Sequence, residues 1–300
     1  MKSFLAPLRA TFAFLLVALN TGVHVPVLLL FALFKLMLRF RAAQVGLTRV
    51  LIAIATRWVS VNSALMRGLT PTRYVFEGLD TLKPEGWYLV IANHQSWVDI
   101  PVLQMALNRR IPMLKFFLKQ QLMWVPVMGL AWWALDFPFM RRHAREQIAR
   151  DPSLRGKDIE STRRACAKFR YTPVSVMNFV EGSRFTPAKH ARQNSPYTHL
   201  LAPKAGGVAF VLQAMGDSLQ ALVDVSIAYP AGRPSLYDLL AGRIPEIRVR
   251  VSQRPLPRDL LGRDYQEDAD FRERFQIWLN GLWAEKDAEL DRLLARPHAR

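Results

Sequence analysis

Cysteine and acidic residues are scarce in this chain of 300 residues. The single cysteine, Cys166, excludes an intramolecular disulfide framework and a metal centre built from several cysteines. It lies in the predicted helix at residues 160–171, where we expect a small buried hydrophobic residue rather than a nucleophile. The 24 acidic residues are outnumbered by 41 basic ones, which gives a formal net charge of +17. An anionic partner is therefore expected: nucleic acid, an anionic membrane surface or a phosphorylated substrate.

Hydrophobic residues make up 51% of the chain, and eight residues are tryptophan. Such apolarity is unusual for a basic protein that binds nucleic acid and ordinary for one that works on a membrane. We therefore expect a phospholipid membrane as a partner and no nucleic acid.

Charged residues are absent from residues 11–34, a stretch long enough for a bilayer span of about 20 residues. Its middle, residues 20–26, contains Gly and Pro, so three alternatives stay open. These are a single transmembrane helix, a helical hairpin bent at residues 20–26 and lying partly in the interface, and a signal peptide. The signal peptide is disfavoured because no clear small-x-small cleavage site follows. Residues 44–66 predict a second apolar helix, which lies either on the membrane surface or in the domain. For the two apolar segments together, 11–34 and 44–66, the alternative is a buried helical hairpin.

From residue 71 onwards, predicted strands alternate with predicted helices. We expect strands at residues 74–76, 87–91, 112–118, 174–180, 219–228 and 247–251. We expect helices at residues 100–107, 122–135, 158–170, 206–215 and 268–294. This order predicts an α/β domain with a largely covered sheet. The predicted organisation is therefore N-terminal membrane-associated helices (1–69), an α/β domain (70–255) and a C-terminal helical extension packed on it (256–300).

A histidine and a carboxylate, His94 and Asp99, follow the strand predicted at residues 87–91. On one helix they would point roughly 140° apart, so they meet only if His94 lies in a loop and Asp99 begins the next helix. Pro101 favours that helix start, because proline is tolerated in a first turn. A carboxylate on one ring nitrogen leaves the other as a base for a hydroxyl that attacks an ester or thioester. The alternative is that Asp99 only caps the helix, as Ser96-x-x-Asp99 permits.

Two further stretches carry arginines behind predicted strands. In residues 181–184, Gly182 permits a tight turn and Arg184 offers a fork of donors suited to phosphate. Ligands collect at the carboxyl ends of strands, so this loop and the His94 loop are expected to share a face. In residues 137–142, one of two adjacent arginines could hold a phosphate. The alternatives are a solvated arginine in the first stretch and a basic loop attracted to anionic lipid in the second.

With these stretches in view, the sequence resembles the glycerolipid acyltransferase family, which includes 1-acylglycerol-3-phosphate and lysocardiolipin-type acyltransferases. Residues 93–99 match the family's Asn-His-x4-Asp block in full. Residues 139–142 resemble its Phe-Ile-x-Arg block with Met for Ile, and residues 181–184 resemble its Glu-Gly-Thr-Arg block with Ser for Thr. Residues 222–230 lack the internal proline of the fourth block and are more similar to the lysocardiolipin-type branch. The resemblance covers about residues 70–230.

The resemblance implies a mixed central sheet flanked by helices, as in glycerol-3-phosphate acyltransferases, and a transfer reaction. His94 would be the general base on the free hydroxyl of a lysophospholipid, and Asp99 would orient it. The hydroxyl would attack the thioester of acyl-CoA or acyl-carrier protein, so neither a metal nor a cofactor is expected. The implied substrate-binding residues are Arg142, Glu181, Gly182, Ser183 and Arg184, with support from Asn93 and Ser96.

The favoured acceptor is 1-acyl-sn-glycerol-3-phosphate, which would give phosphatidic acid for phospholipid biosynthesis. Lysophosphatidylglycerol, lysocardiolipin or another lysophospholipid are the alternatives. A non-catalytic, basic, membrane-anchored protein that binds lipid is the alternative from a different class. The arginine-rich composition favours a bacterial protein, which would lie at the cytoplasmic (inner) membrane with its catalytic domain facing the cytoplasm.

Overall fold

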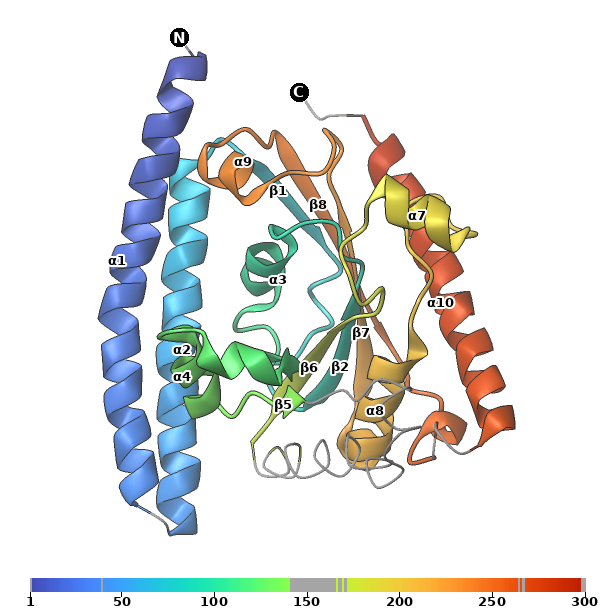
Figure 1. The fold of residues 1–300 in the computed structure, drawn as a ribbon, viewed down its shortest axis with the longest axis horizontal. Helices are drawn as coiled ribbons and strands as arrows, with labels where there is room; N and C mark the ends of the chain where they lie inside the picture. The colour runs from blue at the N-terminus through green and yellow to red at the C-terminus, as the bar shows by residue number, and fades with distance from the viewer. Residues whose placement is uncertain are drawn as a thin grey trace.

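The structure is a computed structural model, which describes residues 2–38, 40–140, 166, 169, 172–263, 265 and 268–297. A six-stranded sheet lies at its centre, with the strand order β1-β8-β7-β2-β6-β3 (Figure 1). Its strands are β1 (Arg73–Glu77), β2 (Trp87–Ala92), β3 (Leu114–Phe116), β6 (Val174–Phe179), β7 (Ala221–Ala228) and β8 (Glu246–Arg254). A separate two-stranded sheet pairs β4 (Leu118–Lys119) with β5 (Phe139–Met140).

The central sheet is mixed, as expected. Strand β2 runs parallel to both β6 and β7, and β3 runs parallel to β6. Strand β8 runs antiparallel to β7 and parallel to β1. Every residue of β7 is buried, including the polar Asp224 and Ser226, because this central strand is covered on both faces. The carboxyl ends of β7, β2, β6 and β3 share one edge of the sheet, where the predicted site loops begin.

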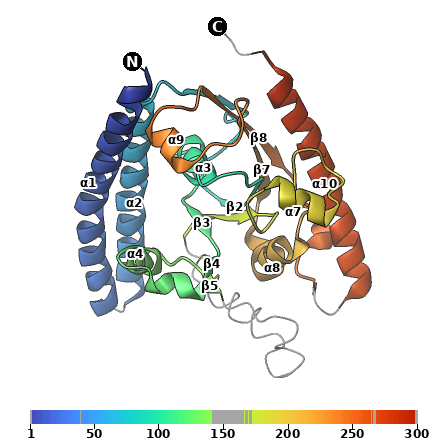
Figure 2. The same ribbon diagram turned by 45° about the horizontal axis from the view of Figure 1, so that its top comes forward.

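Helices cover both faces of this sheet (Figures 1 and 2). On one face lie α3 (Asp99–Leu107) and a hairpin of two long helices, α1 (Lys2–Met37) and α2 (Arg41–Leu69). On the other lie α8 (Ala205–Met215) and α10 (Ala269–Ala295). The last predicted helix, at residues 268–294, is present as α10. It packs on the sheet through Phe271, Phe275, Leu279 and Leu282, which are all buried in the core.

The helix α1 runs without a break through residues 20–26, so the alternative of a hairpin bent there is wrong. The polar residues of this stretch serve packing between helices instead. The Asn20 side chain donates to the Trp58 carbonyl oxygen (3.1 Å) and to Asn62 Oδ1 (2.8 Å) on α2. The chain reverses after Met37, which makes α1 and α2 a hairpin. Among the described residues, α1 alone is long and apolar enough to cross a membrane, and most of its apolar stretch is exposed.

Some elements differ from the sequence-based predictions. The helix predicted at residues 122–135 is split into the 3-10 helix η1 (Gln120–Trp124) and α4 (Met128–Ala134), because Pro126 interrupts it. The chain after residues 181–184, for which no helix was predicted, forms α7 (Pro187–Gln193), whose N-cap Thr186 accepts the Lys189 N–H. The other short helices in the described part of the chain are α9 (Leu236–Leu240), η4 (Gly216–Ser218) and η5 (Arg258–Leu260).

The helix predicted at residues 158–170 lies outside the described residues, apart from Cys166 and Phe169. Both of these side chains are buried in the core. Burial raises the pKa of the Cys166 thiol to about 12. Cys166 is therefore an inert core residue, as predicted.

Candidate active site

His94 and Asp99 meet at the carboxyl end of β2. His94 lies in the loop after this strand, and Asp99 is the first residue of α3. The distance from His94 Nδ1 to Asp99 Oδ2 is 2.8 Å. The Asp99 side chain is fully buried and that of His94 is 15% exposed. The contact expected from the five-residue spacing is thus present, with one ring edge of the histidine reachable from outside.

The Asp99 carboxylate is surrounded by donors. Its Oδ2 atom also accepts the backbone N–H groups of Gln95 (2.6 Å) and Ser96 (2.9 Å). Its Oδ1 atom accepts the Tyr229 hydroxyl (2.6 Å). An ionised carboxylate only accepts hydrogen bonds, so His94 Nδ1 donates and Nε2 keeps a lone pair. One carboxylate therefore fixes both the loop and the imidazole. The N-cap of α3 is Val98 and no side chain caps this helix, so the alternative that Asp99 only caps it is wrong.

Two aromatic residues that the sequence interpretation did not single out complete this arrangement. The Tyr229 side chain is buried, and burial followed by the charge of Asp99 raises its pKa well above its ordinary value. Its phenol therefore stays a hydrogen-bond donor. The Phe179 ring stacks on the His94 ring with 3.9 Å between centroids and 14° between planes. Phe179 is the last residue of β6, and Tyr229 directly follows β7. Both strands are neighbours of β2, so a prediction of the strand order could have identified these two residues.

Glu181 holds the backbone of the histidine loop. Its Oε1 atom accepts the His94 N–H (2.7 Å) and its Oε2 atom accepts the Leu201 N–H (3.0 Å). The residue is fully buried, and this burial raises its pKa to about 7. The resemblance implied that Glu181 is a substrate-binding residue that helps shape the phosphate pocket. In the structure both of its carboxylate oxygens accept backbone N–H groups, and one of these belongs to His94.

Asn93 and Ser96 fasten the same loop to the neighbouring chain. Asn93 Nδ2 donates to the Ile227 carbonyl oxygen and Asn93 Oδ1 accepts the Ile227 N–H, both at 2.9 Å. This pair joins the end of β2 to β7. Ser96 Oγ donates to the Pro234 carbonyl oxygen (2.5 Å) and accepts the Val98 N–H (3.0 Å). Both side chains thus hold the backbone on either side of His94.

The loop with Arg184 adjoins the His94 loop. The Phe185 N–H donates to the His94 carbonyl oxygen (2.7 Å), so the two loops share the face expected for them. The Arg184 guanidinium is exposed and lies 4.5 Å from the centroid of the exposed Trp97 ring. Ser183 is half-buried beside it. Arg142, the other predicted phosphate ligand, lies outside the described residues.

Gly182 is required at its position by the backbone. Its φ of +67° lies in the left-handed region, and a Cβ there would lie 3.1 Å from Lys204 Cδ. Basic side chains gather around this turn. Lys189 Nζ donates to the Arg184 carbonyl oxygen (2.9 Å), and Arg233 Nη1 donates to the Phe185 carbonyl oxygen (3.0 Å). The arrangement places a cluster of cations beside the loop that carries His94. Within the described residues there is no group of three or more His, Cys, Asp or Glu side chains placed to hold a metal ion.

Comparison with known proteins gives one family. The family model described as Acyltransferase matches residues 73–230. The chain is 25% identical over 253 residues to lysocardiolipin acyltransferase 1 from Gallus gallus, covering 80% of this chain and 62% of that protein. It is 28% identical over 214 residues to 1-acyl-sn-glycerol-3-phosphate acyltransferase gamma from Mus musculus, covering 67% and 51%. The chain thus spans only about half to three-fifths of the length of these relatives.

A solved structure has the same fold. The 1-acyl-sn-glycerophosphate (LPA) acyltransferase PlsC from Thermotoga maritima superposes with a TM-score of 0.60, over 100% of both chains, at 16% identity. At this identity the likeness concerns the fold, which includes the mixed sheet flanked by helices.

Proposed function

Because this chain belongs to the acyltransferase family, whose model matches more than half of its residues, we propose that it acylates the free hydroxyl of a lysophospholipid. The acyl donor would be acyl-CoA or acyl-carrier protein. The observation that carries the proposal is the 2.8 Å contact between His94 Nδ1 and the buried Asp99, which leaves Nε2 as a base. The buried Cys166, with its raised pKa, offers no competing nucleophile.

The reaction would proceed in two proton transfers around His94. Nε2 takes the proton of the acceptor hydroxyl while its oxygen attacks the carbonyl carbon of the thioester. Asp99 stabilises the imidazolium that forms. The tetrahedral intermediate then expels the thiolate, which receives the proton from His94, so the products are an ester and a free thiol.

The acceptor phosphate would bind at the cations around Gly182. Arg184 is the first candidate, because its guanidinium is exposed and held over the Trp97 ring near the histidine loop. A planar guanidinium suits two oxygens of one phosphate. Lys204 and Arg233 are near enough to the same turn to add positive charge. Arg142 remains a second proposed phosphate ligand, from the resemblance alone.

The first candidate acceptor is 1-acyl-sn-glycerol-3-phosphate. A lysocardiolipin-type acceptor, including lysophosphatidylglycerol, is the second candidate, and two observations favour it. The lysocardiolipin relative covers 80% of this chain, and residues 222–230 follow that branch rather than the proline-containing block. A single experiment with a fixed donor and varied acceptors separates the two.

We propose that the α1–α2 hairpin attaches the protein to one membrane leaflet without crossing it. Near one end of α1, Ala6 packs with Ala241 after α9. Near the other end, Ala32 belongs to the same core cluster as Ala134 of α4. The two points are about 39 Å apart at 1.5 Å per residue, which exceeds a hydrocarbon core of about 30 Å. A crossing helix would therefore draw the charged domain into the bilayer. The membrane proposed is the bacterial inner membrane, with the domain on its cytoplasmic side.

The test measures thiol release from oleoyl-CoA by the protein purified in detergent. Separate reactions contain lysophosphatidic acid, lysophosphatidylglycerol, lysocardiolipin or no acceptor. Release that depends on lysophosphatidic acid supports the first candidate, and release that depends on either of the others supports the second. If folded protein releases no thiol from oleoyl-CoA, the reactions are repeated with oleoyl-acyl-carrier protein. No release from that donor with any acceptor means that catalysis is wrong and the non-catalytic lipid-binding alternative takes its place.

A further inference from the structure

Most exposed large hydrophobic side chains outside the hairpin, among the residues that the structure describes, lie in one short stretch. We call it the η1–α4 patch. Trp124 is 83% exposed and Leu130 is 55% exposed. The full patch consists of Trp124, Val125, Val127, Leu130 and Trp133. Soluble surfaces rarely expose so many large apolar groups together, and none of these residues contacts the His94 site.

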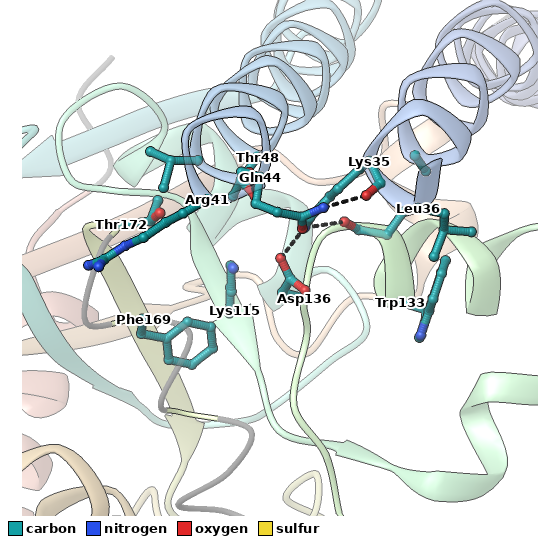
Figure 3. A pocket seen from close by; sticks show the side chains of 13 residues that line it. Lys35, Leu36, Arg41, Gln44, Thr48, Lys115, Trp133, Asp136, Phe169 and Thr172 are labelled. Carbon is teal, nitrogen blue, oxygen red and sulfur yellow. Dashed lines mark hydrogen bonds and ion pairs between the residues drawn. The ribbon is translucent and has the colours of Figure 1, made fainter. Parts of the chain in front are cut away.

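The patch continues the exposed apolar side of α1. Helix α4 packs against the turn end of the hairpin through Ala131 and Ala134, which share a buried cluster with Ala32 (Figures 1 and 2). The opposite side of α4 faces outwards. Leu36 of α1 is 53% exposed and Trp133 is 42% exposed, and both border the same cavity of about 440 Å³ (Figure 3). The two apolar surfaces therefore meet at the rim of one cavity.

The surroundings of the patch are basic. The cavity beside it is lined by Arg41, by the buried Lys115 and by Lys35, which forms an ion pair with the carboxylate of Asp136 (Figure 3). Residues 112–135 contain no Asp or Glu. A surface of this kind attracts anionic phosphate groups, whereas a second copy of a chain with net charge +17 is repelled.

We propose that the η1–α4 patch is a second membrane contact, which inserts at the boundary between headgroups and acyl chains of an anionic bilayer. Tryptophan is enriched at this boundary, and apolar helix faces are buried there beside cations. The proposal rests on the membrane attachment proposed above for the hairpin. It adds a consequence for catalysis. The hairpin alone leaves the protein free to rotate about the α1 axis, and a second contact beside that axis fixes the angle at which the His94 edge of the sheet faces the lipid.

The test places an environment-sensitive fluorophore on full-length protein at a single new cysteine. The variants are Leu130→Cys in the patch, Leu33→Cys on α1 and Ile277→Cys on α10, which is 63% exposed on the far side of the sheet. The native Cys166 is buried and does not compete for the label. The probes are read with vesicles of phosphatidylglycerol and phosphatidylcholine in equal parts, with and without lipid that carries a nitroxide on its acyl chain.

We expect a blue shift and nitroxide quenching at positions 130 and 33, and neither change at position 277. An aqueous spectrum at 130 with a quenched probe at 33 overturns the patch and leaves the hairpin attachment intact. An aqueous spectrum at both positions overturns the attachment and the patch together. A blue shift at 130 that needs no vesicles and grows with protein concentration overturns the patch in favour of a second copy of the chain.

A charge substitution gives an independent measurement. Leu130→Glu should weaken partitioning onto the same vesicles about tenfold, because a charged group replaces an inserted apolar one. Ile277→Glu, the matched control, should leave partitioning unchanged. Equal partitioning of the two variants contradicts the proposal.

Discussion

Replacing Glu181 by glutamine tests two properties of one buried carboxylate. It holds the backbone N–H of His94, and its pKa is raised, which makes stability depend on pH. The two oxygens accept the backbone N–H groups of His94 and Leu201 at 2.7 and 3.0 Å. In Glu181→Gln one of these N–H groups faces an amide NH2 instead of an acceptor. The loss of a hydrogen bond to a charged group costs about 1.5–3 kcal/mol. Because the bond to His94 is the shorter one and holds the base in place, we expect a lower kcat with little change in the KM for the acceptor.

The pH dependence of stability gives the sharper signature. Burial raises the pKa of Glu181 from its ordinary value of 4.5 to about 7 in the folded protein. A raised pKa means that the folded state prefers the protonated form, so the contribution to stability is complete below pH 4.5 and is lost as the pH rises to about 7. The difference corresponds to about 3 kcal/mol of unfolding free energy. Catalysis should follow the opposite trend, because only the carboxylate accepts from both backbone donors.

The assay compares the wild type with Glu181→Gln. For each protein it records the unfolding temperature in detergent and kcat between pH 5 and about 8.5, a range that lies on both sides of the raised pKa. We expect the wild type to lose stability and gain activity across this range, and the variant to be flatter in both. If the variant has the same pH slopes as the wild type, Glu181 is not the titrating group and the positioning role is wrong.

Three other substitutions test the surroundings of the base. Tyr229→Phe removes the 2.6 Å donor to Asp99 and should lower kcat about tenfold with an unchanged acceptor KM, as measured by initial rates; an unchanged kcat contradicts the role. Arg184→Ala should raise the acceptor KM by about tenfold, and Arg184→Lys should restore part of it; a change confined to the acyl-donor KM refutes phosphate binding. Gly182→Ala should lower the unfolding free energy by about 1–2 kcal/mol in denaturant titration, because its φ is +67° and the new Cβ would lie 3.1 Å from Lys204 Cδ. A neutral effect contradicts the strain argument.

The parts of the site that were predictable from the sequence are local ones. The contact between His94 and Asp99 depends on five residues and a helix start marked by Pro101, and both are readable in the chain. The bonds from Tyr229 to Asp99 and from Asn93 to Ile227 join positions more than 100 residues apart. They depend on β7 lying next to β2, which the alternation of strands and helices does not specify.

The fold shows the same division. The apolar residues of β2, β7 and α10 predicted the bounds of these elements to within two residues. Burial of a strand or of one helix face leaves a local pattern of apolar residues in the sequence. The Gly and Pro in residues 20–26 predicted a bend as one alternative, whereas α1 continues through them and Asn20 bonds to partners on α2 that no local pattern reveals. The apolar stretch at residues 122–135 predicted one helix, whereas the missing N–H of Pro126 divides it.

The most direct test of the central claim compares acyl transfer by the wild type and His94→Ala on the same vesicles. Transfer from oleoyl-CoA to lysophospholipid is measured as product ester and released thiol, and vesicle binding is measured in parallel. General-base catalysis contributes roughly 100- to 10,000-fold, so we expect a loss of that size with vesicle binding unchanged. Unchanged turnover in His94→Ala would contradict the assignment of His94 as the base.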